Sequence, residues 1–251
     1  MMTPEEFHNI YRAESEFWWY QGMRAITWAL LDPLLPRGLS KGLDGGCGTG
    51  MNAQEFEKRY GIRMHGVDLE LLGVQYCRKK GLDRSAVASI LELPFGDNSF
   101  DFLSSMDVFP LLPPGGDDKV LQEFRRVLRP GGWLVLRVAA FRALRSRHSQ
   151  YVAESHRYRA GELLSKLSAA RFEVLRWTYA NSFLSPVAWV KFRIWEGLTR
   201  QQPHSGVAAK LPPWLNRLLL AVLQSEAALL RSGFRFPFGQ SLMAVARKPA
   251  P

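Results

Sequence analysis

From about residue 40 onward, short apolar runs alternate with longer amphipathic runs along the chain. The short runs are rich in Val, Leu or Phe and are bounded by Gly, Pro, Asp or Asn, which is the pattern of strands. They lie at Gly42–Gly46, Met64–Leu69, Ala86–Ser89, Phe100–Met106, Trp133–Ala139, Phe172–Tyr179 and Leu242–Arg247. Strands that alternate with helices pair in parallel, with helices on both faces of the sheet. The pattern therefore predicts an α/β fold with a doubly wound, mostly parallel sheet of seven strands.

The clearest helical pattern covers Asp117–Leu128, where apolar residues recur at helical spacing and charged residues take the opposite face. Asp117 or Asp118 can cap its start. Pro130-Gly131-Gly132 is expected to stop this helix and turn the chain into the next strand. A second helix is expected over about residues 160–170.

Two segments lie outside this alternation. The first forty residues are aromatic, and about sixty residues with several Trp and Leu side chains separate the last two strands. We expect an N-terminal helical lid over residues 1–40, an α/β domain over 41–181 and 239–251, and a helical cap inserted over 182–238. The Leu-rich helix Trp214–Leu230 is open to two interpretations: burial within the cap, or contact with a membrane surface or an apolar acceptor.

Composition narrows the class of protein. The chain has 251 residues, of which 47% are hydrophobic and 22% charged, as in globular domains. The formal net charge of +10 fits either an Arg-rich soluble protein or an anionic partner such as RNA or phospholipid. Arg residues are scattered rather than gathered in a dense stripe with aromatics, so nucleic acid is not the favoured partner.

Cysteine usage and the N-terminus point to one compartment. Two cysteines, Cys47 and Cys77, are too few for a disulfide framework. The acidic N-terminus lacks the basic and apolar regions of a secretory signal, and no apolar stretch is long enough to span a bilayer. We expect a cytoplasmic protein.

Residues 43–50 read Leu-Asp-Gly-Gly-Cys-Gly-Thr-Gly, between a predicted strand and a predicted helix. Glycines at such a junction let a ligand approach the backbone closely, and the helix start presents its amides to that ligand. Dinucleotide enzymes also use a Gly-rich turn here. Asp44, however, would repel a pyrophosphate and attract a ligand with an ammonium and a sulfonium. The charge thus favours S-adenosylmethionine over NAD.

These residues resemble the first motif of class I methyltransferases, and further motifs follow in that family's order. Gly66-Val67-Asp68 resembles the second-strand motif, whose acid binds the ribose hydroxyls. Leu93-Pro94-Phe95 with Asp97–Asp101, and then Leu128–Gly132, resemble the methyltransferase type 11 group, which includes ubiquinone/menaquinone-type enzymes. The resemblance covers roughly residues 40–180 and implies a Rossmann-like methyltransferase fold.

The resemblance also implies which residues hold S-adenosylmethionine and its product S-adenosylhomocysteine. The expected donor-binding residues in the α/β domain are Asp44, Gly46, Cys47, Gly48, Asp68, Leu69, Ser89, Ile90 and Met106. Trp19 is expected to cover the donor or to pack the N-terminal helix. Arg24 is expected either to pair with the donor carboxylate or to lie on a solvated helix face.

Two positions depart from the family pattern. Ser89 takes the place of an Asp that receives the adenine amino group, and Ile90 with its neighbouring amide is expected to hold the ring instead. Leu111 takes the place of a His near the fourth strand, which removes one candidate base.

After the fifth strand, the segment from His148 to Arg159 is expected near the acceptor. His156 is a candidate general base, and Tyr151 and Tyr158 are candidate substrate contacts. The alternative is local architecture, in which Arg and Tyr side chains fix a loop against a helix start. We find no Cys/His spacing suited to a metal.

Three functions remain open at this point. The favoured one is methyl transfer to a small-molecule or lipid-like acceptor, with peripheral membrane contact as an option. The second is a nucleic-acid methyltransferase. The net charge supports this function, but the chain lacks the Asn/Asp-Pro-Pro-aromatic motif of the enzymes that methylate exocyclic amines. The third is a non-catalytic S-adenosylmethionine-binding protein.

Overall fold

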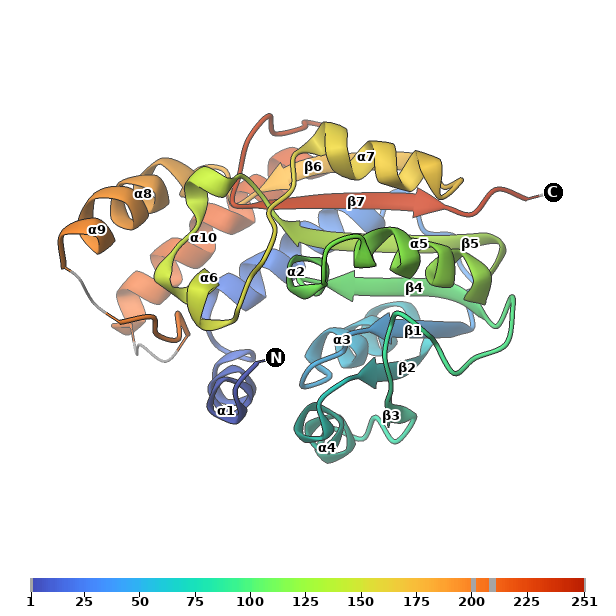
Figure 1. Cartoon of the computed structure of the whole chain (residues 1–251). Coiled ribbons are helices and arrows are strands. Elements are labelled where there is room, and N and C mark those ends of the chain that lie inside the picture. The colour runs from blue at the N-terminus through green and yellow to red at the C-terminus, as the bar shows by residue number, and fades with distance from the viewer. Residues whose placement is uncertain (1, 200–201, 208–210, 251) are drawn as a thin grey trace. The chain divides into compact units, whose positions relative to one another are not determined.

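The structure is a computed structural model that describes residues 2–199, 202–207 and 211–250. Its seven strands form one sheet in the order β3-β2-β1-β4-β5-β7-β6 (Figure 1). The strands are β1 Lys41–Gly45, β2 Arg63–Asp68, β3 Ser85–Val87, β4 Phe100–Met106, β5 Leu128–Ala139, β6 Glu173–Ala180 and β7 Ser241–Arg247. This confirms the α/β class, the seven-stranded sheet and the helical insert before the last strand.

The sheet is mostly parallel with an antiparallel end. The strands from β3 to β5 pair in parallel, with Asp44 opposite Gly66 on β2 and Ser104 on β4. β7 runs the other way, since Gly131 donates to the Lys248 carbonyl and Lys248 donates back to that of Gly132. The carboxyl ends of β1, β2 and β4 therefore share one edge, where ligands of α/β proteins bind.

The helices and helical turns complete the chain. They are α1 Pro4–Ala13, α2 Trp18–Leu31, α3 Met51–Tyr60, α4 Leu71–Lys79, η1 Phe109–Leu111, α5 Gly116–Val127, η2 Arg142–Leu144, α6 Arg147–Tyr151, α7 Ala160–Ala169, α8 Ser185–Val190, the π-helical turn η3 Lys191–Trp195, α9 Glu196–Thr199 and α10 Pro213–Arg231. None of the described helices is long and apolar enough to cross a membrane.

The boundaries of α5 and β5 correct the sequence prediction. The helix starts one residue early, after Gly115, and no side chain caps it, so neither Asp117 nor Asp118 is the cap. Leu128 already begins β5, and Pro130-Gly131-Gly132 lies inside that strand. The reason is a bulge: Phe100 pairs with Leu128, but Phe102 pairs with Trp133.

The chain divides into two compact units. One comprises Met1–Leu35, Val138–Arg159 and Trp177–Met243, and the other comprises Pro36–Arg137, Ala160–Arg176 and Ala244–Pro251. We call them the helical unit and the donor unit. The donor unit contains the complete loop from β1 to α3.

In the helical unit, the N-terminal helix and the insert pack on each other. The Trp18 amide donates to Asn216 Oδ1 at 2.9 Å, and the Asn216 side chain donates to the Glu16 carbonyl. A Cβ on Gly22 would lie only 2.3 Å from Leu223 Cδ1. Close approach of α2 to α10 therefore requires glycine at this point. Because Leu223 and Leu230 are fully buried, part of the Leu-rich helix is core.

This packing predicts the effect of Gly22→Ala. Alanine adds helix propensity of about 1 kcal/mol, but its methyl group would displace Leu223. We expect a net loss of roughly 1–3 kcal/mol in the free energy of unfolding, measured by urea denaturation. Gly161→Ala in α7 is the matched control, because no atom lies within 4 Å of its added Cβ. Equal stability of the two variants would contradict the α2–α10 contact.

Candidate functional site

The loop after β1 is fixed to the end of β2. The amides of Gly46 and Cys47 both donate to the Val67 carbonyl, at 2.8 and 2.9 Å. Gly46, Gly48 and Gly50 have φ values of +78°, +53° and +83°, which L-residues rarely adopt. The motif thus forms a rigid bend at the carboxyl edge of the parallel strands, as the sequence predicted.

The glycines of this bend have different surroundings. A Cβ on Gly46 would lie 2.3 Å from Val108 Cγ2, and one on Gly50 would lie 2.8 Å from Cys77 Sγ. At these two positions glycine is needed for packing within the protein. A Cβ on Gly48 meets no atom within 4 Å. Gly48 therefore presents bare backbone to open space, which is what a ligand cradle requires.

Asp68, at the end of β2, lies beside this open space. Its Oδ2 accepts the Gly48 amide at 2.8 Å and its Oδ1 accepts the Glu70 amide at 3.0 Å. Burial raises the pKa of this carboxyl, although the amide bonds oppose the rise. Each carboxylate oxygen keeps a lone pair for a further donor, so the pair suits two adjacent hydroxyl groups. The next side chain, Leu69, is 61% exposed and offers an apolar surface.

Asp44 is the buried carboxyl of the site. It is 1% exposed, and Ser104 Oγ donates to its Oδ1 at 2.7 Å. Its Oδ2 is buried without a hydrogen-bond partner among the described residues. Burial raises the pKa of Asp44 to about 7; the Ser104 hydrogen bond and the Arg137 charge oppose this rise, and the Asp68 charge adds to it. The free oxygen is suited to a hydrogen-bond donor, above all a cationic one.

An ion pair lies at the carboxyl end of β4. Arg137 in β5 is 4% exposed and lies 2.7 Å from the Asp107 carboxylate. Asp107 follows Met106 and has a φ of +63°. Sequence reasoning placed Met106 here but missed Ser104, Asp107 and Arg137. The signal for Arg137 was a single cation inside the apolar run Leu134–Val138, which predicts a buried carboxylate partner.

Ser89 and Ile90 follow β3, the strand beside β2. The Ala88 amide donates to the Asp68 carbonyl, and Ser89 Oγ accepts the Leu91 amide. Ile90 is 5% exposed, and its Cγ2 lies 3.4 Å from the position of a Cβ on Gly45. The structure thus brings both residues to the edge that carries Asp44 and Asp68.

Cys47 is packed rather than reactive. Its Sγ lies 3.6 Å from Cys77 Sγ, and Cys77 Sγ also donates to the Gly48 carbonyl. The hydrogen bond with Cys77 and burial both raise the pKa of the Cys47 thiol. A thiol held neutral is a poor nucleophile, and the contact of Cys47 with the donor stays a prediction.

The remaining predicted residues belong to the helical unit. Trp19 packs edge-on against Tyr20, and Arg24 Nη1 donates to the Glu14 carbonyl at 3.0 Å. His156 packs edge-on against Tyr158, which is 1% exposed. The roles of these four residues toward donor and acceptor stay predictions.

Two residues of the predicted acceptor segment, Tyr151 and Arg157, also lie in this unit, and the role of Tyr151 toward the acceptor stays a prediction. Tyr151 Oη lies 3.1 Å from Thr3 Oγ1. Arg157 bonds Glu154, Ser149 and the Ala140 carbonyl. These contacts favour an architectural role for Arg157.

Sequence reasoning missed a buried carboxyl in this unit. Glu6 is 0% exposed, and neither of its oxygens has a hydrogen-bond partner among the described residues. His148 Nδ1 lies 3.9 Å away but accepts the Gly206 amide, so it cannot donate to Glu6. Burial lowers the pKa of His148. No sequence signal marked Glu6, which lies in an ordinary acidic first turn of α1.

Comparison with solved structures defines the class of fold. A putative methyltransferase in complex with the Haloferax volcanii Trm112 activator superimposes with a TM-score of 0.60 at 20% identity, over 98% of this chain and 97% of that one. Geranyl diphosphate methyltransferase in complex with geranyl diphosphate and sinefungin gives 0.57 at 19% identity, over 90% and 77%. The fold is that of the Rossmann-like methyltransferases.

Comparison of sequences identifies the domain. Residues 43–136 match the methyltransferase domain family of type 11. Among the described residues no cluster of His, Cys, Asp or Glu could hold a metal ion. Residues 43–136 are thus similar to the methyltransferase domain family, within the fold that the solved structures share.

Curated relatives match over this same region. Sterol 24-C-methyltransferase ERG6B of Gibberella zeae is 30% identical over 54% of this chain. Fatty-acid O-methyltransferase of Mycolicibacterium smegmatis is 33% identical over 53%, and 2-methyl-6-phytyl-1,4-hydroquinone methyltransferase of Synechocystis is 32% identical over 43%. The matches span 40%, 48% and 34% of those proteins, less than half of each.

The buried Asp44 predicts a pH-dependent stability difference for Asp44→Asn. The pKa of about 7 exceeds the unfolded value of 3.8, so stability is lost as the pH rises from about 4 to 7. Asn carries no charge and removes this loss. In urea denaturation, the variant should gain on the wild type as the pH rises, by on the order of 2–4 kcal/mol at pH 8 relative to pH 4.

Asp101→Asn is the control with the opposite sign. Burial disfavours the charged form of Asp101, but hydrogen bonds from Ser40, Lys41 and Arg129 outweigh it and lower its pKa. Its stabilising contribution is therefore present above the unfolded pKa and is lost in acid. A pH-independent effect of Asp44→Asn would contradict the raised pKa that burial gives the Asp44 carboxyl.

The Gly48→Ala variant tests whether Gly48 borders the donor, and a matched glycine variant accounts for backbone strain. The added methyl would enter the open space beside Asp68, so the affinity for S-adenosylmethionine should fall at least about tenfold by calorimetry, the equivalent of ~1.4 kcal/mol. Gly61→Ala is matched, since Gly61 has a φ of +68° and its Cβ also meets no atom. Both variants should lose roughly 1–2 kcal/mol of stability. Equal donor affinity in the two variants would remove Gly48 from the site.

Proposed function

We propose that this protein transfers a methyl group from S-adenosylmethionine to a small, lipid-like acceptor. The single observation that carries the proposal is the juxtaposition of Asp44, Gly48 and Asp68. A buried carboxylate oxygen without a partner, bare glycine backbone and a carboxylate with spare lone pairs lie together at one sheet edge. This set suits a cationic nucleoside and is unsuited to a pyrophosphate.

Each residue of the set has a distinct part in holding the donor. Asp68 accepts hydrogen bonds from the ribose hydroxyls, and Leu69 and Ile90 contact the adenine. Asp44 receives the ammonium group through its free oxygen. The sulfonium supplies an activated methyl group for direct displacement, which leaves S-adenosylhomocysteine. The protein then needs chiefly to position the acceptor and exclude water.

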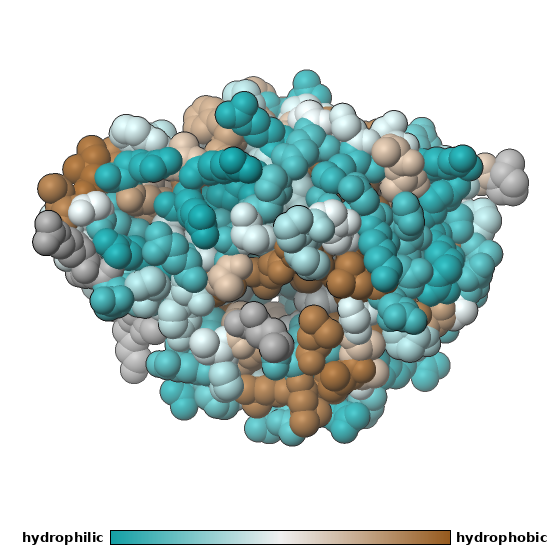
Figure 2. Space-filling view, in the orientation of Figure 1, coloured by the Kyte–Doolittle hydropathy of each residue, from teal (hydrophilic) through white to brown (hydrophobic). Residues whose placement is uncertain are grey.

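The proposed acceptor class rests on the relatives and on an exposed surface. The relatives' names give a sterol, a fatty acid and a phytyl hydroquinone as acceptors, all with large apolar parts. In the helical unit, apolar side chains line α8, η3 and α9, and Figure 2 shows hydrophobic surface over this segment. Trp195 is 63% and Leu198 77% exposed, with Lys191 and Arg193 between the apolar positions. Such a mixture suits the interface of a lipid bilayer.

Two further points complete the proposal. Acidic acceptors such as carboxylates or phenols need no protein base, so His156 serves as base only toward an alcohol.

The thiols of Cys47 and Cys77 lie 3.6 Å apart and are both free, which suits a reducing compartment. The proposal includes a cytoplasmic location with peripheral contact to membrane.

Transfer of a labelled methyl group tests the proposal. S-adenosylmethionine labelled on its methyl group should label a long-chain fatty acid or a prenylated hydroquinone presented in vesicles, and leave RNA unlabelled. Asp68→Ala should lower the rate at least roughly tenfold, through loss of two hydroxyl contacts. Labelling of RNA alone would replace the proposed acceptor with nucleic acid. Donor binding without labelling of any acceptor would favour a non-catalytic binding protein.

The same assay tests the membrane surface. Trp195→Ser combined with Leu198→Ser should lower the rate roughly tenfold with vesicle-borne acceptor but not with a soluble short-chain analogue, because only partition to the bilayer is impaired. Leu175→Ser is the control, since Leu175 is 36% exposed on β6, outside this segment. An equal effect on both substrate forms would contradict the bilayer contact.

A further inference from the structure

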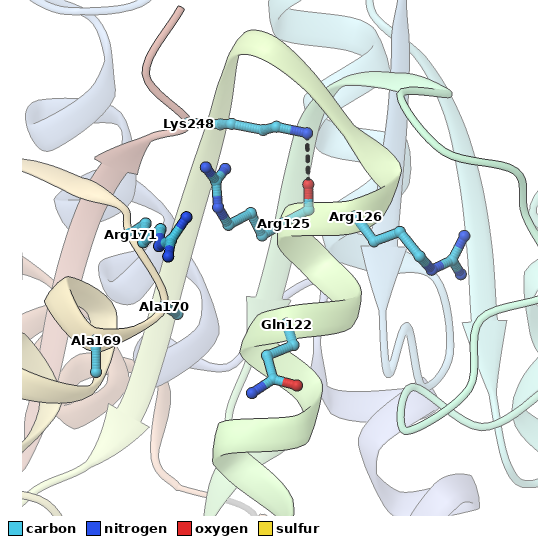
Figure 3. A pocket seen from close by; sticks show the side chains of 7 residues that line it. All are labelled: Gln122, Arg125, Arg126, Ala169, Ala170, Arg171 and Lys248. Carbon is cyan, nitrogen blue, oxygen red and sulfur yellow. Dashed lines mark hydrogen bonds between the residues drawn. The ribbon is translucent and has the colours of Figure 1, made fainter. Parts of the chain in front are cut away.

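A cationic cavity lies in the donor unit at the sheet edge opposite the donor loop. It is formed where α5, α7 and the antiparallel β7 end, and these ends lie beside the amino ends of the parallel strands. Its volume is about 460 Å³. It is lined by Gln122, Arg125, Arg126, Ala169, Ala170, Arg171 and Lys248 (Figure 3). The lining thus holds four cations, one amide and no carboxylate.

Two of the four cations have protein partners that explain them. Lys248 Nζ donates to Asn98 Oδ1 and to the carbonyls of Arg125 and Leu128, which fixes the end of α5. Arg126 pairs with Glu123 and Asp97, and its guanidinium points away from the other cations (Figure 3). These two side chains are structural members of the rim.

The other two cations, Arg125 and Arg171, have no comparable set of protein partners. Arg125 Nη1 is buried and has no hydrogen-bond partner among the described residues. Arg171 is exposed and has a φ of +58°, and within the described part of the chain no carboxylate pairs with its guanidinium. Figure 3 shows both guanidinium groups on the same side of the cavity, near Lys248. Arg125 and Lys248 repel each other. Burial, and then the positive charge of Arg125, lower the pKa of the Lys248 ammonium group.

Helix ends alone do not account for this arrangement. The carboxyl ends of α5 and α7 attract cations through their partial negative charge. That attraction supplies no acceptor for a buried guanidinium N–H such as that of Arg125 Nη1, which is destabilising when it is unpaired. A tetrahedral oxyanion would supply acceptors to both guanidiniums and offset the repulsion among the cations.

We propose that this cavity binds the phosphate groups of a small phosphorylated molecule through Arg125 and Arg171. Gln122 adds a neutral donor, and Ala169 and Ala170 leave room at the wall. A cavity of about 460 Å³ admits a diphosphate or a compact phosphate ester. The site is separate from the donor loop, and its occupancy is independent of the proposed methyl transfer.

Calorimetric titration with inorganic pyrophosphate tests the site in the full chain. The wild type should bind one pyrophosphate, and Arg125→Gln and Arg171→Gln should each weaken binding roughly tenfold through loss of a charge-assisted contact. Arg78→Gln is the control, because Arg78 is an exposed cation on α4 and removes the same charge elsewhere. Thermal unfolding of each variant verifies that it is folded, and S-adenosylmethionine affinity should be unchanged in all of them.

The possible outcomes distinguish the sources of phosphate. Competition by phosphate-headed lipid vesicles, with no binding of free pyrophosphate, would overturn the small-molecule assignment in favour of a membrane. Binding of RNA only, with a steep salt dependence, would overturn it in favour of nucleic acid. Equal weakening by Arg78→Gln would show attraction to net charge alone, and no binding of any of the three would also overturn the proposal.

Discussion

Burial of the Asp44 carboxyl at the end of β1 is the constraint on which the site depends. A carboxyl that is 1% exposed and has one unpartnered oxygen is costly in the protein alone. Ser104 and Arg137 limit the cost from neighbouring strands, and the pKa of Asp44 still rises to about 7. A buried carboxyl of this kind is typical of a binding site in which a cationic ligand pairs with the unpartnered oxygen.

The parallel sheet is what places the other parts of the site around Asp44. Register pairs Asp44 with Gly66 on one side and Ser104 on the other, so the chain leaving each strand reaches the same edge. The Val67 carbonyl holds the glycine bend, and Asp68 holds the Gly48 amide. The antiparallel β7 brings Lys248 to the opposite edge, where a second group of polar contacts forms. One topology therefore separates a carboxylate-rich edge from a cationic one.

Much of the fold could be predicted from the sequence because its signals are local. Glycines bound the strands, apolar residues recur in α5, and Asp44, Gly48 and Asp68 lie at motif spacing. The bulge in β5 could not be predicted, because Pro130-Gly131-Gly132 reads as a turn until the pairing with β7 is known. The roles of Ser104 and Glu6 could not be predicted from the sequence for the same reason. Their surroundings are set by residues distant in the chain, and neither residue type is unusual where it stands.

The proposed acceptor surface differs in its physical chemistry from the proposed donor site. The proposed donor site consists of a few buried polar groups whose geometry is fixed by strands. The helical unit instead presents exposed Trp, Val, Ile and Leu side chains on α8, η3 and α9, a surface with little directional chemistry. Apolar surfaces of this kind accept many lipid-like partners.

Calorimetric titration of the full chain with S-adenosylmethionine and, separately, with NAD tests the central claim most directly. The account predicts one bound S-adenosylmethionine per chain, no binding of NAD, and an affinity that falls as the pH drops below about 7, where Asp44 takes up a proton. Binding of NAD with no binding of S-adenosylmethionine would show that the bend cradles a pyrophosphate, and would contradict the assignment of Asp44.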